Sequence, residues 1–303
     1  KTAHEICEDW IKRLAFGPDK NNAAIIQVWL SIFAVNWRQL PNPSWLNRQI
    51  ETIERFQLGT YPELLANLLY EPAILHSLNG FQNHRKNPNE NLGREVLELY
   101  SLGEGNYSEA DVQQVALALT GFRLNKSNEV VIIPQRHDPG PHIILGKKAK
   151  FDSASLATWL GNQQSTSTYI SKRIWRRWIG TEPSQKRVNE FASSWYKNEL
   201  SLPWLYTNLS KQPEAIKCAE LGLRLLDPID VVARSLQLLG SLHPSAFKIA
   251  FSIQSLMGQP PFSPPSVKGW PYGEQWLTSR WMAARKRGLL RLLTDEEVWN
   301  SRS

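Results

Sequence analysis

The sequence predicts an all-α fold: a multi-helix single globular domain with one small β-hairpin excursion near residues 130–145. Apolar residues make up 42% of the 303 residues and charged residues 21%, which is the composition of a globular chain long enough to bury a core. Apolar residues recur at helical spacing over most of the chain, in about a dozen segments. A β-branched run next to prolines replaces this pattern near residues 130–145.

The longest apolar run of the helical first half, residues 1–124, extends from Ala23 to Val35 and includes Gln27 and Ser31. Its 13 residues are fewer than the roughly 20 that a membrane-spanning helix needs. We therefore expect a core helix here and no transmembrane segment in the chain.

A helix with two contrasting faces is predicted from residue 87. Asn87 is a suitable N-cap, and Pro88 suits the first helical position. The apolar stripe consists of Leu92, Val96, Leu99 and Tyr100, and the polar face of Asn91, Arg94, Glu95 and Glu98. Spacing alone favours a solvated polar face, on which Glu90 pairs with Arg94 at i, i+4. The alternative is a polar network or site that faces inward. The next helix opens with a capping box formed by Ser108 and Asp111.

The hairpin is predicted within a connector, residues 125–150. The β-branched residues 130–133 precede three prolines, and residues 143–145 are again apolar. Strand-forming residues on both sides of a Pro/Gly turn are typical of a hairpin.

His137 and Asp138, next to Gly140, are expected to brace the turn through bonds from side chain to backbone. A metal site made of His137, Asp138 and Glu95 is the less favoured alternative, because no two histidines have helical ligand spacing. Phosphate-cradling and dinucleotide-binding motifs are also absent from the sequence. We therefore expect no metal and no cofactor.

In the helical second half, residues 151–303, basic residues cluster in one predicted helix. They are Lys172, Arg173, Arg176 and Arg177, interleaved with Trp175 and Trp178. Ile170, Ile174 and Trp178 form the buried line of this helix, so we favour a solvated basic face over a nucleic-acid groove. The net charge of +7 is a modest excess, so nucleic acid is not expected as a partner.

A second Pro-rich stretch, residues 258–265, cannot be helical because proline lacks an amide donor and restrains the residue before it. It leads to Lys268, Gly269, Trp270 and Pro271. Aromatic residues and prolines in such a loop usually pin it onto a core, and a rigid loop can also wall a pocket.

The two cysteines, Cys7 and Cys218, lie far apart and lack CxxC spacing, which excludes a cysteine zinc site. Buried free thiols are favoured over a disulfide between them.

Four segments resemble, in order, the motifs of the bacterial domain-of-unknown-function family 1800 (DUF1800). They are residues 87–122, residues 136–146 with Arg136-His137-Asp138-Pro139-Gly140, residues 169–178, and residues 258–271 with Val267-Lys268-Gly269-Trp270-Pro271. The resemblance implies one domain over residues 1–303. The sequence departs from the family at residues 29–33, which lack two histidines, and at His142, which replaces a lysine.

The resemblance implies an exported protein, periplasmic or extracellular. It also implies a protein partner that resembles alkaline phosphatases or sulfatases, because such proteins are often encoded beside family members. The preferred hypothesis is therefore a non-catalytic envelope or assembly protein that binds a partner protein. Its candidate binding residues are Trp45, Trp204, Trp270, Trp281 and Trp299, taken from a chain with 13 tryptophans. This hypothesis predicts an exposed apolar patch of about 600 Å² or more.

The alternative hypothesis is an enzyme of unknown class, with hydrolysis among the options, whose polar site lies between the two helical halves. Its candidate catalytic residues are Glu90, Asn91, Arg94, Glu95, His137, Asp138, Lys172 and Lys268. Glu90 or Glu95 would be the general acid or base, and Lys172 or Lys268 would stabilise charge. Asn91 and Arg94 would orient an anionic group. Because the polar face starting near residue 87 is the most family-like feature, we expect Asn91, Arg94 and Glu95 to be buried and bonded to other segments.

A weaker alternative is glycan or polyanion binding through exposed tryptophans and arginines.

Overall fold

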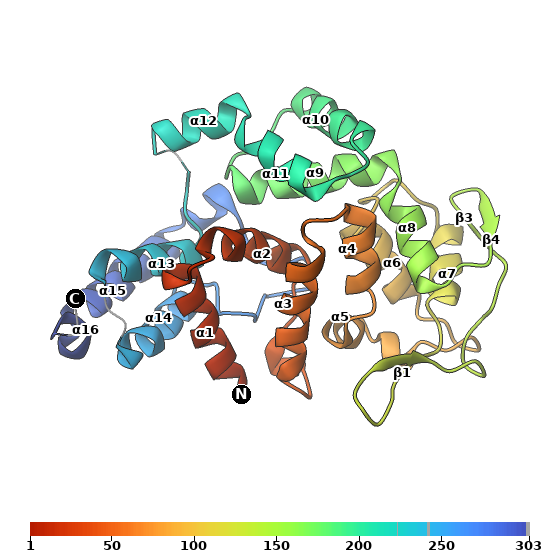
Figure 1. Cartoon of the computed structure of the whole chain (residues 1–303), viewed down its shortest axis with the longest axis horizontal. Coiled ribbons are helices and arrows are strands. Elements are labelled where there is room, and N and C mark those ends of the chain that lie inside the picture. Colours follow the sequence, from red (N-terminus) through yellow and green to blue (C-terminus); the bar gives the residue numbers. More distant parts are fainter. Residues whose placement is uncertain (223, 241–242, 301–303) are drawn as a thin grey trace. The chain divides into compact units, whose positions relative to one another are not determined.

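The computed structural model describes residues 1–222, 224–240 and 243–300. Figure 1 shows a mainly helical chain with a few short strands, which confirms the predicted fold class. The α-helices are α1 (Ala3–Phe16), α2 (Lys20–Ile32), α3 (Ser44–Phe56), α4 (Tyr61–Leu68), α5 (Pro72–Ser77), α6 (Glu90–Leu99), α7 (Glu109–Ala118), α8 (Ser153–Gly161), α9 (Gln164–Trp178), α10 (Gln185–Lys197), α11 (Leu202–Ser210), α12 (Pro213–Glu220), α13 (Pro228–Leu239), α14 (Pro244–Leu256), α15 (Ser279–Thr294) and α16 (Glu296–Asn300). Short 3-10 helices are η1 (Trp37–Gln39), η2 (Gly80–Gln82) and η3 (Gly273–Trp276).

The chain divides into two compact units, each discontinuous in sequence. Unit 1 comprises Lys1–Ser44, Arg176–Glu182 and Pro213–Ser303, and unit 2 comprises Trp45–Trp175 and Pro183–Gln212. The units do not follow the predicted helical halves, because the N-terminal segment groups with the C-terminal one. That the chain is a single domain stays a prediction.

Unit 1 is built around α1, α13, α14 and α15. Helix α1 packs on α2, α13 and α14, and α14 packs on α15. The core includes Ile11, Leu236 and Ile253, all fully buried. Gly288 lets α15 approach α14 closely, because a Cβ atom there would lie 2.5 Å from Cγ2 of Ile253.

Unit 2 packs α4 on α8 and α6 on α7. Helix α6 begins at Glu90 with Asn89 as its N-cap, two residues later than predicted: the Asn89 side chain accepts a bond from the amide of Leu92. The predicted capping box of Ser108 and Asp111 opens α7. No helix in the described part of the chain combines the length and the apolar character that crossing a membrane requires.

The predicted strand segments do not pair with each other but form two separate antiparallel hairpins. Strand β1 (Phe122–Leu124) pairs with β2 (Val130–Ile132), and β3 (His142–Ile144) pairs with β4 (Lys147–Ala149). The turn between β3 and β4 consists of Leu145 and Gly146, with φ of 49° and 76°. Two successive positive φ values suit a tight hairpin turn, so β3 turns back at once to β4.

Candidate functional site

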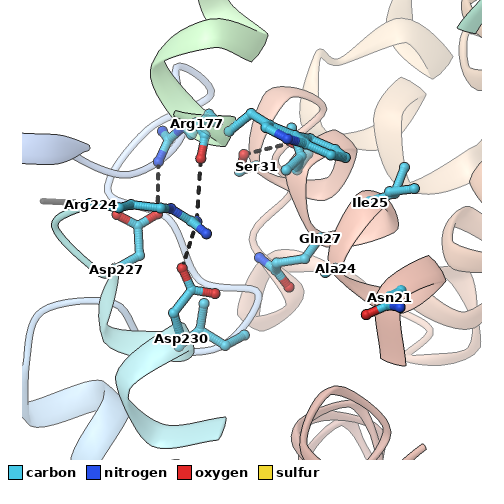
Figure 2. A pocket seen from close by; sticks show the side chains of 12 residues that line it. Asn21, Ala24, Ile25, Gln27, Ser31, Arg177, Arg224, Asp227 and Asp230 are labelled. Carbon is cyan, nitrogen blue, oxygen red and sulfur yellow. Dashed lines mark hydrogen bonds and ion pairs between the residues drawn. The ribbon is translucent and has the colours of Figure 1, made fainter. Parts of the chain in front are cut away.

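A pocket of about 340 Å³ lies in unit 1. Three segments line it: one face of α2, the last turn of α9 with Arg177 and Trp178, and residues 224–230 at the start of α13. Figure 2 shows that side chains of these segments face one another across the pocket.

Helix α2 contributes a mixed wall. Asn21, Ala24, Ile25 and Val28 recur at helical spacing and therefore share one face of the helix. Gln27 accepts a bond at Oε1 from the indole nitrogen of Trp10, at 2.6 Å. Its amide nitrogen makes no hydrogen bond within the part of the chain that the structure describes. Gln27 thus offers a fixed donor to the pocket.

Arg177 anchors the opposite wall. Its side chain is only 8% exposed, lies 3.6 Å from the carboxylate of Asp227, and donates to the carbonyl of Pro271 at 3.0 Å and to that of Trp270. The Pro-rich C-terminal segment therefore supplies backbone acceptors to an arginine from α9. Gly269 lets the same segment lie close to α2, since with φ of 91° a Cβ atom there would lie 2.6 Å from the carbonyl oxygen of Ser31.

Asp227 precedes Pro228, the first residue of α13, but its carboxylate does not cap the helix. It accepts a hydrogen bond from the indole nitrogen of Trp276 at 2.9 Å. Burial raises the pKa of Asp227 to about 6, and the nearby guanidinium of Arg177 opposes that rise. Asp227 is therefore a carboxyl group that can exchange a proton near neutral pH.

A second ion pair lies closer to solvent. Arg224 and Asp230 are 2.8 Å apart and about one third exposed, and Arg224 also approaches the carbonyl of Arg177 at 3.5 Å. The two arginines and two aspartates that line the pocket give it no net charge. Such a site can hold a polar ligand by directed hydrogen bonds, and Asp227 could act in proton transfer.

None of the eight candidate catalytic residues lines this pocket. Glu90, Asn91, Arg94 and Glu95 lie on α6 in unit 2, where Glu90 and Asn91 are exposed. The predicted burial is wrong for Asn91, because α6 buries its opposite face, Leu92 and Val96, against the core of unit 2.

Arg94 and Glu95 are half-buried. Arg94 does bond to another segment, since its guanidinium makes a two-pronged ion pair with Glu109 of α7 at 2.9 and 2.6 Å. This pair is solvent-facing and joins two neighbouring helices.

His137 and Asp138 brace the turn before β3, as the sequence favoured. The Nδ1 atom of His137 lies 2.9 Å from the carbonyl oxygen of Thr120, whose hydroxyl accepts a bond from the amide of Asp138. The carboxylate of Asp138 accepts a bond from the amide of Gly140 and lies 3.1 Å from Nε2 of His142, which is buried.

The basic cluster of α9 is not the solvated face that the sequence favoured. Arg177 is buried, and Arg173 donates to the carbonyl of Leu99 at 2.6 Å. Lys172 is half-buried in the same helix, whereas Lys268 is exposed on the Pro-rich segment of unit 1. The arginines are drawn inward because backbone carbonyls at loop and helix ends need donors.

The five candidate binding tryptophans have different surroundings. Trp45 and Trp270 are 3% and 5% exposed, so their expected role as surface anchors is wrong. Trp45 belongs to the buried stripe of α3, and Trp270 packs with Ala34 and Trp276. Trp204 and Trp281 are half-buried, against Phe191 and Trp276 respectively. Trp299 is exposed.

Helix α15 has a partly exposed apolar stripe, which we call the α15 face: the exposed Met282, Leu290 and Leu293 and the half-buried Leu289, together with the exposed Lys286. Met282, Leu290 and Leu293 are each between 47% and 50% exposed. The opposite side of the helix buries Ala284, Gly288 and Leu292. Helix α15 contains five basic residues and no acidic residue: Arg280, Arg285, Lys286, Arg287 and Arg291. Four of them are exposed, whereas Arg285 is half-buried and donates to the carbonyl of Leu226 at 2.7 Å.

Arg224, Asp227 and Asp230 were missed by sequence reasoning. Asp227-Pro228 is a recognisable helix start, and three charged residues within residues 224–230 interrupt an otherwise apolar segment. This cluster of charged residues at a helix start was the sequence pattern that could have indicated a site. Their partners on α2 and α9 lie far away in sequence.

Metal-ligating residues do not gather in the described parts of either unit: no group of three or more His, Cys, Asp or Glu side chains could hold a metal ion there. Cys7 and Cys218 are buried free thiols.

The family model described as "Protein of unknown function (DUF1800)" matches residues 1–300. No curated protein and no solved structure matches the chain.

Proposed function

The chain belongs to the DUF1800 family of proteins of unknown function, and we propose that it is a non-catalytic assembly protein that binds an acidic partner protein on the α15 face. The observation that supports this proposal is the α15 face itself, where large apolar side chains stay half exposed. Exposed apolar side chains that gather on one surface are typical of interaction sites.

The charge of α15 indicates the kind of partner. The four exposed basic residues of this helix attract an acidic surface and disfavour basic partners, since the helix contains no acidic residue. The apolar stripe suits an amphipathic helix whose apolar residues pack on Leu290 and Leu293, while its flanking acidic residues meet Arg287 and Arg291. Trp299, exposed on α16, is a further candidate contact. An exported partner that resembles alkaline phosphatases or sulfatases stays the expectation from the family resemblance.

Site-specific photo-crosslinking tests this proposal in the native host. A benzophenone amino acid is placed at Leu290 or Leu293, and at Leu238 as control, since Leu238 is also an exposed leucine of unit 1. We expect one and the same protein to be captured from positions 290 and 293 through an acidic segment, and not from position 238. Adding Lys286→Glu and Arg287→Glu should abolish capture. Capture of the same proteins from all three positions, or of no protein, would refute the proposal.

A second candidate function is an enzyme that uses Asp227 for proton transfer. Its support is the pKa of about 6 of this carboxyl group on a pocket wall. The candidate acid–base residue is thus Asp227 at the start of α13, in place of Glu90 or Glu95 of α6. A folded Asp227→Asn variant that binds the partner normally but loses biological activity would favour the enzyme over the assembly protein.

A further inference from the structure

The charged residues that line the pocket of unit 1 are balanced. Arg177 and Asp227 lie 3.6 Å apart, and Arg224 and Asp230 lie 2.8 Å apart. A bound anion near an arginine would also lie near an aspartate, which repels it. A bound cation near an aspartate would likewise be repelled by the neighbouring arginine. Either ion would lose water without gaining an uncompensated opposite charge, so the lining disfavours a charged ligand.

The pocket nevertheless offers unused hydrogen-bonding groups on both sides. Arg224 uses only Nη2 in its bonds to described residues, which leaves Nε and Nη1 as donors. Asp230 receives that bond at Oδ2, which leaves Oδ1 as an acceptor. Gln27 presents its amide nitrogen, and Figure 2 shows it across the pocket from Arg224 and Asp230.

Hydroxyl groups match this pattern best. A hydroxyl both donates and accepts, so neighbouring hydroxyls on one ring can donate to Asp230 while they accept from Arg224 and Gln27. Hydrogen bonds to ionised groups are about twice as strong as neutral ones, which makes the Arg224–Asp230 pair an effective reader of such a ligand.

The wall of α2 adds an apolar surface. Ala24, Ile25 and Val28 line the pocket, as does the indole of Trp178. The C–H face of a sugar ring packs on such groups while its hydroxyls point to the polar wall. The volume of about 340 Å³ lies at the lower end of the range for small-molecule pockets, about 300 to 1,000 Å³. From these observations we infer that the pocket binds one uncharged sugar residue, held by Arg224, Asp230 and Gln27.

This inference does not depend on the α15 face, because none of the residues of that face lines the pocket. Partner binding and sugar binding can therefore fail or succeed separately.

Saturation-transfer NMR on the full chain tests the inference. The probes are glucose, galactose, mannose and N-acetylglucosamine as neutral sugars, with glucuronate as the anion and glucosamine as the cation. Ala24→Trp should fill the pocket without disturbing the core, because Ala24 is an exposed lining residue. Ala219→Trp is the matched control, because Ala219 is an exposed alanine on another helix of unit 1, α12.

We expect at least one neutral sugar to bind the wild type and the Ala219→Trp variant, and to lose binding in Ala24→Trp. Asp230→Asn should weaken binding about tenfold, the loss expected for one hydrogen bond to a charged group. The inference is wrong if no neutral sugar binds, if glucuronate or glucosamine binds more tightly than all of them, or if Ala24→Trp binds like the wild type.

Discussion

The carboxylate of Asp227 accepts a hydrogen bond from the indole nitrogen of Trp276 at 2.9 Å. This bond joins the start of α13 to η3, the 3-10 helix that follows the Pro-rich C-terminal segment. Arg177 connects to both parts, because it lies 3.6 Å from Asp227 and donates to the carbonyl of Pro271. The pocket of unit 1 therefore has a wall fixed by bonds between three distant segments.

Asp227 should make stability depend on pH. Its pKa of about 6 in the folded chain exceeds the ordinary value of 3.8, so the folded state holds this proton more tightly than the unfolded state. Stability from Asp227 is present below pH 4 and is lost as pH rises through 6, by about 3 kcal/mol in total. Urea unfolding of wild type and Asp227→Asn at pH 4.5 and 7.5 measures about two thirds of this loss, because the rest is already lost at pH 4.5. Equal changes with pH in both proteins would contradict it.

Arg177→Lys should destabilise the chain by about 3 kcal/mol, because a lysine cannot serve two carbonyls and a buried carboxylate together. Arg176→Lys is the control: the ion pair of Arg176 with Glu182 is more exposed, so the change should cost at most about 1 kcal/mol. Denaturant unfolding at pH 7 compares the two. A similar cost for both variants would show that Arg177 does not anchor the pocket wall.

Gly269→Ala should cost more than about 2 kcal/mol, because a positive φ is combined with a clash against the carbonyl of Ser31. Gly222→Ala shares the positive φ, of 61°, but meets no atom within 4 Å, so it should cost only about 1 kcal/mol. Thermal and urea unfolding measure both. If the two variants lose equal stability, the close approach of Gly269 to Ser31 is unimportant.

Asn83→Ala should strongly lower the stability of unit 2. The fully buried Asn83 donates to the carbonyls of Ala116 and Leu119 at 2.8 Å and accepts from the amide of Asn89 at 2.7 Å. Removing its side chain leaves three backbone groups without a hydrogen-bond partner, which should lower the free energy of unfolding by about 3 kcal/mol or more. Arg94→Ala, which breaks a solvent-facing pair with Glu109, should leave unfolding nearly unchanged. The reverse order of the two effects would contradict this account of what stabilises unit 2.

The fold class could be predicted because helical spacing and capping residues are local signals. The buried stripe of α3, with Trp45, Ile50 and Ile53, was also visible in the sequence. Trp45 was nevertheless expected at the surface, because proline and polar residues stand beside it in the sequence. The predicted pairing of the two strand segments was wrong. The tight turn at Leu145 and Gly146 pairs β3 with β4, the next strand along the chain.

The pocket could not be predicted, because no local pattern brings its residues together. Gln27, Arg177 and Asp230 lie on three helices that are separated by long stretches of sequence. Arg177 in particular looked like one of four solvated basic residues. Its burial depends on the carbonyls of Trp270 and Pro271 and on the carboxylate of Asp227, which all lie far from it in sequence.

The most direct measurement for the proposed function is the affinity of the photo-crosslinked partner for wild-type chain and for Leu290→Ser/Leu293→Ser, by isothermal calorimetry. Both leucines are about half exposed, so the variant should fold normally. The account predicts that the double variant binds at least about tenfold more weakly, as loss of central apolar contacts does, whereas Leu238→Ser binds like wild type. Equal affinity of the double variant and the wild type would contradict the assignment of the α15 face as the partner-binding surface.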